Sequence, residues 1–561
     1  RHSMKKKYVR WTLWTIASPF ILFIILCILI YLPPIQNFLV DKAAVYASEA
    51  TGMNISVGRI SLSFPLNLVV TNVDAASPHN DTLLSVRRLQ VNVQLLPLLK
   101  KQVEVDGISL QGATVNSNDL IHGMKLNGTL GELFISSHGV ALDPETAIVN
   151  KVLLKDTDLS LCLNDTAAAD TAASDTTYWK IILQDIDLQN VSFALDMPLD
   201  SLSLAASLDN AILRDGLIDL HKSAYSLQTF RIKNGRVRYD SGKPLAADSL
   251  PSGLDPSHIA LTDIGVKLDS LYYGGRNMKA IISQFVLKER SGVEIVSATG
   301  RMVSNDKVLR VPSLKLETRD SYLELNAAMD WNALDFKDEG LVSARLMADI
   351  GKPDVVRFMG SMDEKFIRQY PSEPLRIRTG IDGDLNKLKL TTLTAELPGA
   401  LGLFARGELT HLTDSLLRGG DITLEAETKD LKFVSTLAEG IEIPYGTRLE
   451  GKFTMAGTKM GTDLLLMQPE AQAVVAADTI PITVYNDSIS VADDFKMERA
   501  ARLFAKYDLS RDRYEADLAV NHFDLHQFMP ADSLYTLSTR LKVEGEGFDF
   551  FSPRTYFNAE G

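Results

Sequence analysis

Hydrophobic and polar residues alternate one by one along much of this 561-residue chain. In residues 89–95, for example, Leu, Val, Val and Leu alternate with Gln, Asn and Gln. Successive side chains of a strand point to opposite faces, so this period of two predicts strands with one apolar and one polar face. No long helical segments alternate with these strands, which argues against a doubly wound α/β fold. We therefore expect a mainly β fold, a long repetitive β-sheet with a few short helices.

One local pattern recurs along the first half of the chain. In residues 186–193, two alternating apolar residues precede a Gln-Asn pair, and two more alternating apolar residues follow it. Residues 103–110, 230–239 and, more weakly, 68–73 repeat the pattern at intervals of very roughly 40 residues. Asn and Gly accept unusual backbone angles, so the pattern predicts a bulge or tight corner that shifts the strand phase. The apolar residues expected to line one face are Val91, Val93, Val103, Val105, Ile108, Leu110, Ile186, Leu188, Val191, Phe193, Phe230, Ile232 and Val237.

Residues 11–32 form a stretch without any charged side chain. As a helix this stretch would be roughly 33 Å long, which is enough to cross the hydrocarbon core of a bilayer. Basic residues precede it, so the positive-inside rule places residues 1–10 in the cytoplasm and the rest of the chain across the membrane. A cleaved signal peptide fits less well, because the stretch is long and no small-residue cleavage site follows it. We expect a single transmembrane helix whose membrane-anchoring residues include Trp11, Trp14, Phe20, Phe23 and Leu32.

Residues 33–53 are expected to form an amphipathic helix after the membrane span. Two prolines end the span, apolar residues then recur near helical spacing, and Gly52 stands at the C-terminal stop. The body is expected to comprise a first β segment at 54–240 with a mobile loop at 164–177, a connection at 241–258 and continuing β repeats at 259–561. Three short helices, at 354–369, 430–439 and 524–529, are each expected to begin at an Asp, which is a good N-cap.

Composition narrows the classes of function. Hydrophobic residues make up 45% of the chain, more than one membrane span can supply, so the body itself must be rich in aliphatic residues. The formal net charge of −13 argues against nucleic acid as a partner, because phosphate binding needs clustered Lys and Arg. The two cysteines, Cys27 in the apolar stretch and Cys162 in the body, would lie on different sides of the membrane boundary and form no structural disulfide.

Two histidines are the strongest candidates for a metal site. His522 and His526 are four residues apart, a spacing that places both rings on one side of a helix. However, Asp524 is expected to begin the helix, which leaves His522 on the preceding strand. No third ligand is close in sequence, so we expect no metal site.

Other candidate chemistry also has a simpler explanation. Residues 446–452 match the front of a phosphate-binding loop, but Phe453 stands where Ser or Thr must hold magnesium. Paired carboxylates at 185 with 187 and at 544 with 546 follow from the strand period on a solvated face. We therefore expect no catalytic residues and no cofactor, and do not expect an enzyme.

The first part of the chain resembles the AsmA-like/TamB family of envelope proteins. The shared features are the apolar span, the Pro-ended exit, the amphipathic helix closing at Thr51-Gly52 and the strand pair from Asn54 to Val73. Residues 84–99 and 103–115 are similar to the next two segments of that family, and residues 380–407 and 514–547 to repeats of its Bacteroidota branch. Family members are usually much longer and end in a characteristic C-terminal domain, so we expect this chain to be an N-terminal fragment.

The resemblance implies a curled sheet, a half-pipe with an apolar inner face, anchored in the inner membrane of a Gram-negative bacterium with its body in the periplasm. It implies transport of phospholipid toward the outer membrane; some members partner an outer-membrane barrel of the Omp85 type. An alternative is an assembly factor for outer-membrane β-barrel or autotransporter proteins, acting through an exposed sheet edge. A scaffold with a packed interior is a further alternative, and a one-residue error in strand phase would exchange the two faces.

Overall fold

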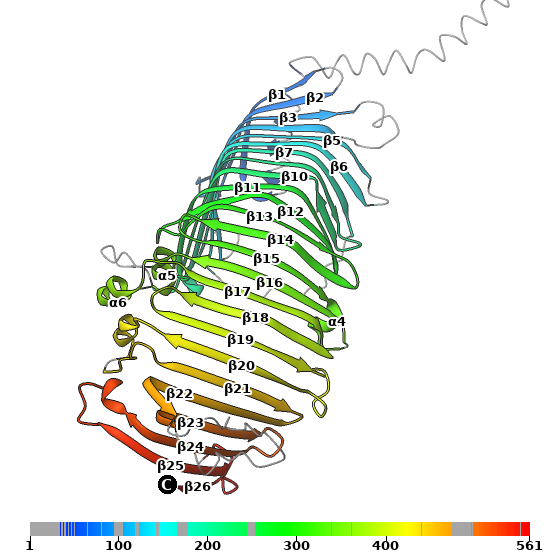
Figure 1. The fold of residues 1–561 in the computed structure, drawn as a ribbon. Helices are drawn as coiled ribbons and strands as arrows, with labels where there is room; N and C mark the ends of the chain where they lie inside the picture. The colour runs from blue at the N-terminus through cyan, green and yellow to red at the C-terminus, as the bar shows by residue number, and fades with distance from the viewer. Residues whose placement is uncertain are drawn as a thin grey trace, which may run out of the picture. The chain divides into compact units, whose positions relative to one another are not determined.

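Strands dominate the computed structural model of this chain (Figure 1). They make up 68% of it and helices 9%, which confirms the expected mainly β fold. The expected membrane span with its anchoring residues, Val103, and residues 165–177 of the expected loop lie outside the described residues. The structure describes residues 34, 38, 41–42, 44–45, 48–49, 51–63, 66–79, 81–94, 105–117, 123–141, 145–164, 178–243, 253–337, 339–360, 362–438, 440–473, 495, 497–549 and 551–561.

The chain divides into two units, each described by itself. Unit 1 comprises Arg1–Asp248 with Pro256–Gly275, and unit 2 comprises Ser249–Asp255 with Arg276–Gly561. At the start of unit 1, the described residues between 34 and 51 are helical. Gly52 follows with φ at +69°, and its N–H donates to the Ser48 carbonyl at 2.9 Å. This left-handed glycine ends the helix in the ordinary way, because no Cβ opposes the conformation.

Unit 1 is a sheet in which most strands pair with their neighbours in the chain. All its pairs are antiparallel except β6 with β7, which are parallel, and the short β9 pairs with β8 and β11 while β8 also pairs with β10. A 3₁₀ helix, η1 (Pro198–Asp200), joins β7 to β8. The strands are β1 (Asn54–Ser63), β2 (Asn67–Ala76), β3 (Thr82–Val93), β4 (Val105–Asn116), β5 (Met124–Ala141), β6 (Thr146–Leu163), β7 (Lys180–Met197), β8 (Leu202–Asp219), β9 (Ala224–Leu227), β10 (Thr229–Ser241) and β11 (His258–Gly274).

A row of unpaired residues, which we call the crease, crosses unit 1 at one position of the pairing. Each of nine strands omits one residue there, while the residues on either side of it pair normally. On β7 this residue is Asn190, which has φ at +51°, and on β10 it is Asn234, with φ at +53°. The phase shift expected at these Asn positions is therefore confirmed. The crease consists of Gly58, Asn72, Arg87, Gly112, Gly131, Asp156, Asn190, Asp209 and Asn234.

Unit 2 is an antiparallel meander in which every described strand pairs with the next one in the chain (Figure 1). Short connections make this arrangement local, since a hairpin needs only a few residues. The strands are β12 (Asn277–Glu289), β13 (Glu294–Ser304), β14 (Val308–Thr318), β15 (Tyr322–Asp330), β16 (Leu341–Ile350), β17 (Leu375–Asp384), β18 (Lys387–Leu397), β19 (Leu401–Thr410), β20 (Gly419–Thr428), β21 (Arg448–Ala456), β22 (Lys459–Ala473), β23 (Met497–Asp508), β24 (Arg513–Asp524), β25 (Thr536–Glu546) and β26 (Tyr556–Glu560).

Short helices fill the longer connections of unit 2. The helix expected at 354–369 is wrong as a single element: it is two helices, α5 (Lys352–Met359) and α6 (Glu364–Gln369). Asp354 lies inside α5, and it is Asp363 that caps α6 by accepting from the Lys365 N–H. The patches at 430–439 and 524–529 contain the 3₁₀ helices η2 (Lys432–Thr436) and η3 (Leu525–Gln527). One further helix, α4 (Trp331–Leu334), was not expected.

Candidate functional site

The strand pairing of unit 1 aligns apolar residues into continuous rows. Residues that pair directly lie side by side on the same face of a sheet. One row runs from β1 to β11, apart from the short β9, without a polar residue. It consists of Leu62, Leu68, Val91, Ile108, Ile135, Val152, Ile186, Leu213, Phe230 and Leu268.

Parallel rows continue this surface. The second row is Ile60, Val70, Leu89, Leu110, Leu133, Leu154, Leu188, Ala211, Ile232 and Val266. The third, beyond the crease, is Val57, Val73, Val86, Ala113, Leu130, Thr157, Val191, Leu208, Gly235 and Ile264, and the fourth is Ile55, Ala75, Leu84, Val115, Gly128, Leu159, Phe193, Ala206, Val237 and Leu261. Because the crease removes one residue from the pairing of each strand, the rows on both sides share one face. We call these rows the apolar face of unit 1.

The residues expected from the sequence to line one face lie on these rows, as far as the structure describes them. Val93 and Val105 pair with each other beside the first row. The first row holds Val91, Ile108, Ile186 and Phe230, the second Leu110, Leu188 and Ile232, the third Val191, and the fourth Phe193 and Val237. The pairing therefore brings together residues that are up to about 150 positions apart in the sequence, while their role as a lipid lining stays a prediction.

The opposite face of unit 1 is polar where it borders the crease. Cross-strand hydrogen bonds connect its side chains: Asn190 Nδ2 donates to Asp156 Oδ1 at 2.8 Å, and Asn210 Nδ2 donates to Asp187 Oδ1 at 3.2 Å. Such bonds tie neighbouring strands together without covering the sheet. One polar row consists of Arg59, Thr71, Arg88, Gln111, Glu132, Lys155, Gln189, Asn210 and Lys233.

The apolar face of unit 1 has no second layer among the described residues. Every residue of the first row is half-buried and none is fully buried. In the other rows the fully buried side chains are Ala75, Val86, Thr157, Ala211 and Ile264. A sheet face packed against a second layer would bury the side chains of the first row almost completely. The face is therefore a large apolar surface that the described part of the chain leaves accessible.

Unit 2 carries an apolar face of its own. One row crosses β12–β25 with a single polar member, Thr379. The sequence predicted continuing β repeats over residues 259–561 but no lining residue was named there, although leucines at alternate positions in residues 314–325 indicate an apolar face. The row is Ile282, Gly300, Leu314, Leu325, Leu346, Thr379, Leu393, Ala405, Leu424, Gly451, Leu464, Leu503, Leu518 and Leu541.

Large and small residues alternate on part of this face. In a neighbouring row Ala395, Leu403, Ala426 and Leu449 pair in succession across β18–β21. A leucine between two alanines can spread over both, so the face packs partly against itself. This alternation explains how the side chains are half-buried without a second layer.

Short connections border the apolar face of unit 2 at both ends of its strands. Figure 1 shows α4 at one set of strand ends and α5 and α6 at the opposite set. Ala333 of α4 forms a buried cluster with Val342 and Leu385, against which Met329 and Leu388 of the apolar face pack. At the other ends the connections meet the face in a second, aromatic cluster.

In that second cluster, Phe366 of α6 and Phe433 of η2 meet edge to face with ring centroids 5.6 Å apart. Tyr370 lies against Phe433 at 5.1 Å, and burial raises the pKa of its hydroxyl above the ordinary 10.0. Leu375 and Leu401 at the ends of their strands pack on this cluster. The two clusters thus bound the open face, and the strand centres between them stay accessible.

A buried ion pair lies on the polar face of unit 2. Arg502 donates from Nε and Nη2 to the two carboxylate oxygens of Asp463, at 3.0 and 2.8 Å. The side chains are only 6% and 8% exposed, and the guanidinium lies 4.6 Å from the Phe504 ring centroid. Phe495 packs on Phe504 and Ala519, which explains why a charged pair on the polar face is buried. In this bidentate pair each charge compensates the other, so removing one partner alone would leave a buried unpaired charge.

The candidate metal ligands do not come together. His522 lies on β24 and His526 in η3, and the Asp524 carboxylate caps η3 by accepting from the His526 N–H at 3.1 Å. The expected separation of the two histidines by the start of the helix is therefore confirmed. Within the described ranges, no group of three or more His, Cys, Asp or Glu side chains is placed to hold a metal ion.

The paired carboxylates and the loop-like motif have structural roles. Asp185 forms an ion pair with Arg214, and Asp187 accepts from Gln189 at 3.1 Å. Gly446, with φ at +84°, belongs to the turn that leads into β21. The motif at 446–452 therefore runs from a turn into β21 itself, and does not lead into the helix that a phosphate-binding loop requires.

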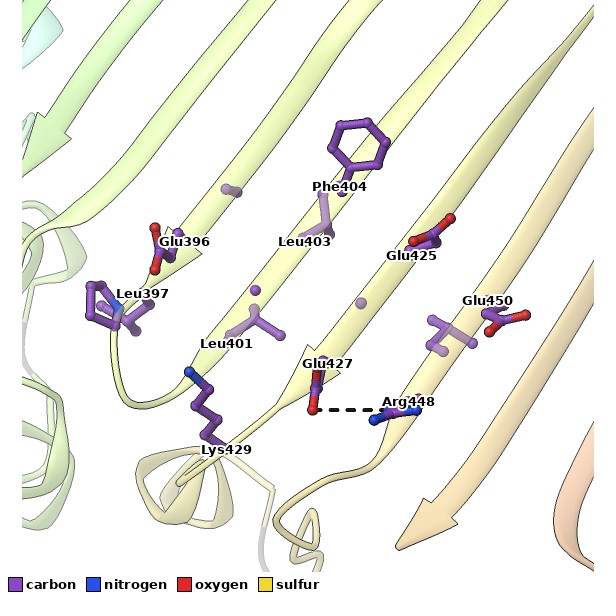
Figure 2. A pocket seen from close by; sticks show the side chains of 15 residues that line it. Glu396, Leu397, Leu401, Leu403, Phe404, Glu425, Glu427, Lys429, Arg448 and Glu450 are labelled. Atoms are coloured by element: carbon purple, nitrogen blue, oxygen red, sulfur yellow. Dashed lines mark ion pairs between the residues drawn. The ribbon is translucent and has the colours of Figure 1, made fainter. Parts of the chain in front are cut away.

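Figure 2 shows a pocket of about 490 Å³ at the ends of β18–β21. Carboxylates dominate its polar lining, and Glu427 forms a long ion pair with Arg448 at 3.9 Å. Glu425 and Glu450 pair directly across two strands. Like charges at such a pair destabilise the sheet, but water weakens their repulsion. The lining has no Ser, Cys or His side chain. The pocket therefore offers less to a ligand than the apolar faces.

These observations define a class: a mainly β protein whose long sheet segments each keep one open apolar face. A comparison with protein-family models gives no match, and neither does a comparison with curated proteins. Among the described residues, no helix has the length and apolar character needed to cross a membrane.

Proposed function

We propose that this protein carries phospholipid along its apolar faces, acting as a bridge between membranes. The observation that carries the proposal is the unbroken first row of unit 1, where ten half-buried apolar residues pair in succession across the sheet. A soluble protein seldom leaves so large an apolar surface open unless something binds there. Acyl chains match such a surface because it is continuous, apolar and free of catalytic groups.

The energetics favour this function. Exposing a methylene to water costs about 0.8 kcal/mol, so an acyl chain of about 16 carbons faces a barrier on the order of 12 kcal/mol in water. Strands lie about 4.8 Å apart, so an acyl chain that crosses the sheet meets a new apolar side chain at every strand. An acyl chain that slides along a row therefore keeps most of its methylenes out of water. This lowers the barrier without any energy-consuming chemistry.

The membrane context is part of the same proposal. Residues 11–32 would anchor the chain in the inner membrane of a Gram-negative bacterium, with the β body in the periplasm. The resemblance of residues 5–115 to AsmA-like/TamB proteins supports a half-pipe architecture and transport toward the outer membrane. In this proposal the apolar face of unit 1 is the side of its sheet that contacts lipid.

Site-specific cross-linking tests the proposal. A photo-reactive amino acid at Leu188 or Ile232 should capture phospholipid, whereas the same residue at the neighbouring Gln189 or Lys233 should not, because successive positions face opposite sides. Mass spectrometry of the irradiated protein identifies the captured lipid. Equal capture at all four positions would refute a one-sided lipid path.

A second candidate function is the assembly of outer-membrane β-barrel or autotransporter proteins with an Omp85-type partner. The observation that favours it is the edge of β1, which among the described strands pairs with β2 alone. An exposed strand can pair with an incoming strand. Depletion of the protein would then lower specific barrel proteins while the lipid distribution between the membranes stays unchanged.

A further inference from the structure

Aromatic residues gather at one set of strand ends in unit 1. Tyr178, Tyr225, Tyr272 and Tyr273 are 52%, 40%, 41% and 47% exposed there. Tyr225 on β9 pairs with Tyr273 on β11, and their rings stack with centroids 6.2 Å apart. We call these four tyrosines the tyrosine rim.

Two ring contacts hold three of the four tyrosines at these strand ends, namely Tyr178 with His221 and Tyr225 with Tyr273. Tyr178 packs edge to face on His221, with ring centroids 5.6 Å apart, and the next residue, Trp179, accepts the N–H of Leu220 at 3.0 Å. The turn that carries His221 leads directly into β9. The rim therefore extends from the start of β7 through this turn and β9 to the end of β11.

The tyrosine rim continues the apolar face. Ala147, Ile181, Ile218, Tyr225 and Tyr273 pair in succession across β6, β7, β8, β9 and β11. Between this row and the first row, Gln184 and Asp215 are left out of the pairing, and Asp215 has φ at +51°. Because each strand leaves one residue out of the pairing here, as at the crease, the row that ends at Tyr273 lies on the same face as the first row. Tyr225 and Tyr273 thus stand where the apolar face reaches its border.

We infer that the tyrosine rim contacts the surface of a phospholipid bilayer and that lipid passes there between the bilayer and the apolar face. Tyrosine combines an apolar ring with a polar hydroxyl, and such residues concentrate at the boundary between acyl chains and headgroups. Lys180 and Lys222 are exposed at the same strand ends, where they can approach lipid phosphates. The nearby Asp219 is buried and caps the turn by accepting from the Lys222 N–H at 3.1 Å. The inference about lipid passage rests on the proposed function, but bilayer contact does not.

Photo-cross-linking of the full chain reconstituted into vesicles of phosphatidylethanolamine and phosphatidylglycerol tests the inference. The reactive residue is placed at Tyr273, at Ile186 on the apolar face, or at Leu199 as a control. Leu199 is 64% exposed and lies in η1, at the opposite end of β7. We expect several-fold more lipid captured at 273 than at 199.

The outcomes separate the two proposals. Capture at 186 with no excess at 273 over 199 overturns the bilayer contact and leaves the proposed function standing. Capture at 273 without capture at 186 supports the bilayer contact and counts against the lipid path. A cross-linked dimer at 273 in place of lipid overturns the inference, because a second copy would then occupy the rim.

A second measurement uses the combined variant Tyr225→Ser with Tyr273→Ser. We expect a several-fold slower initial rate of lipid transfer between vesicle populations, with the far-UV circular dichroism unchanged. Leu199→Ser is the matched control, since it also removes an exposed apolar side chain. Equal rates for both variants would contradict the inference.

Discussion

Charged residues across one strand of the apolar face should block lipid movement. The variant replaces Ile186, Leu188 and Val191 of β7 with Glu, at three successive positions of the apolar face. These positions belong to the first three rows, so the substitution interrupts neighbouring paths at the same strand. All three side chains are half-buried, so the carboxylates can still reach water.

The expected effect follows from the width of the interruption. Strands lie about 4.8 Å apart, so one charged strand leaves about four methylenes of a passing chain without apolar cover. At about 0.8 kcal/mol per methylene, this adds about 3 kcal/mol to the barrier. A tenfold change in rate corresponds to about 1.4 kcal/mol, so transfer should slow about 200-fold.

Transfer of a fluorescent phospholipid between donor and acceptor vesicles measures this rate. The matched control carries Gln189→Glu, Ser192→Glu and Ala194→Glu, three substitutions of the same kind on the other face of β7. Thermal melts followed by circular dichroism check that both variants are folded. Equal transfer rates for the two folded variants would refute the reasoning, because the apolar face would then not be the path.

Three further predictions concern stability. Gly131→Ala should cost about 1–3 kcal/mol, because its Cβ would lie 2.8 Å from the Asp156 Cβ at the crease; thermal melts would contradict this if Gly402→Ala, which meets no atom within 4 Å, cost as much. Arg502→Met should cost about 3–5 kcal/mol in urea unfolding by leaving a buried carboxylate unpaired, and adding Asp463→Leu should recover most of the loss. Because the pKa of Tyr370 is raised by folding, its contribution is full below the unfolded value of 10.0 and is lost as the pH rises further; melts at increasing pH should show a smaller alkaline loss for Tyr370→Phe than for the unchanged chain.

The strand pattern was readable from the sequence because the physical signal is local. Alternation at residues 89–95 and the Gln-Asn pair at 189–190 fix the phase of each strand within a few residues. Neighbouring strands of a meander then pair without long-range information. The lining residues on β7 and β10 could therefore be named before the pairing was known.

Other features depend on contacts between distant residues and could not be derived. The parallel pairing of β6 with β7 has no signature in either strand, since the same alternation suits both directions. The tyrosine rim brings Tyr178 against His221, 43 positions away, and Tyr225 against Tyr273, 48 positions away, and nothing in the local sequence signals these contacts. The helix boundary at Asp354 was wrong because its carboxylate is used elsewhere: it accepts from Ser321 Oγ at 2.6 Å and pairs with Arg357.

The crease explains how nine strands, β1–β8 and β10, keep one apolar face. A strand that gained or lost one residue would turn every later side chain to the opposite face. On β7, Leu188 and Val191 are three positions apart, which in a regular strand would place them on opposite sides. They share a face because Asn190 takes up the additional position in a left-handed conformation, as Asp156 does on β6. On β8, Asp209 is likewise left out of the pairing. A continuous apolar surface thus requires the omission to occur at the same position in every strand, which makes the crease as necessary to the proposed path as the apolar residues themselves.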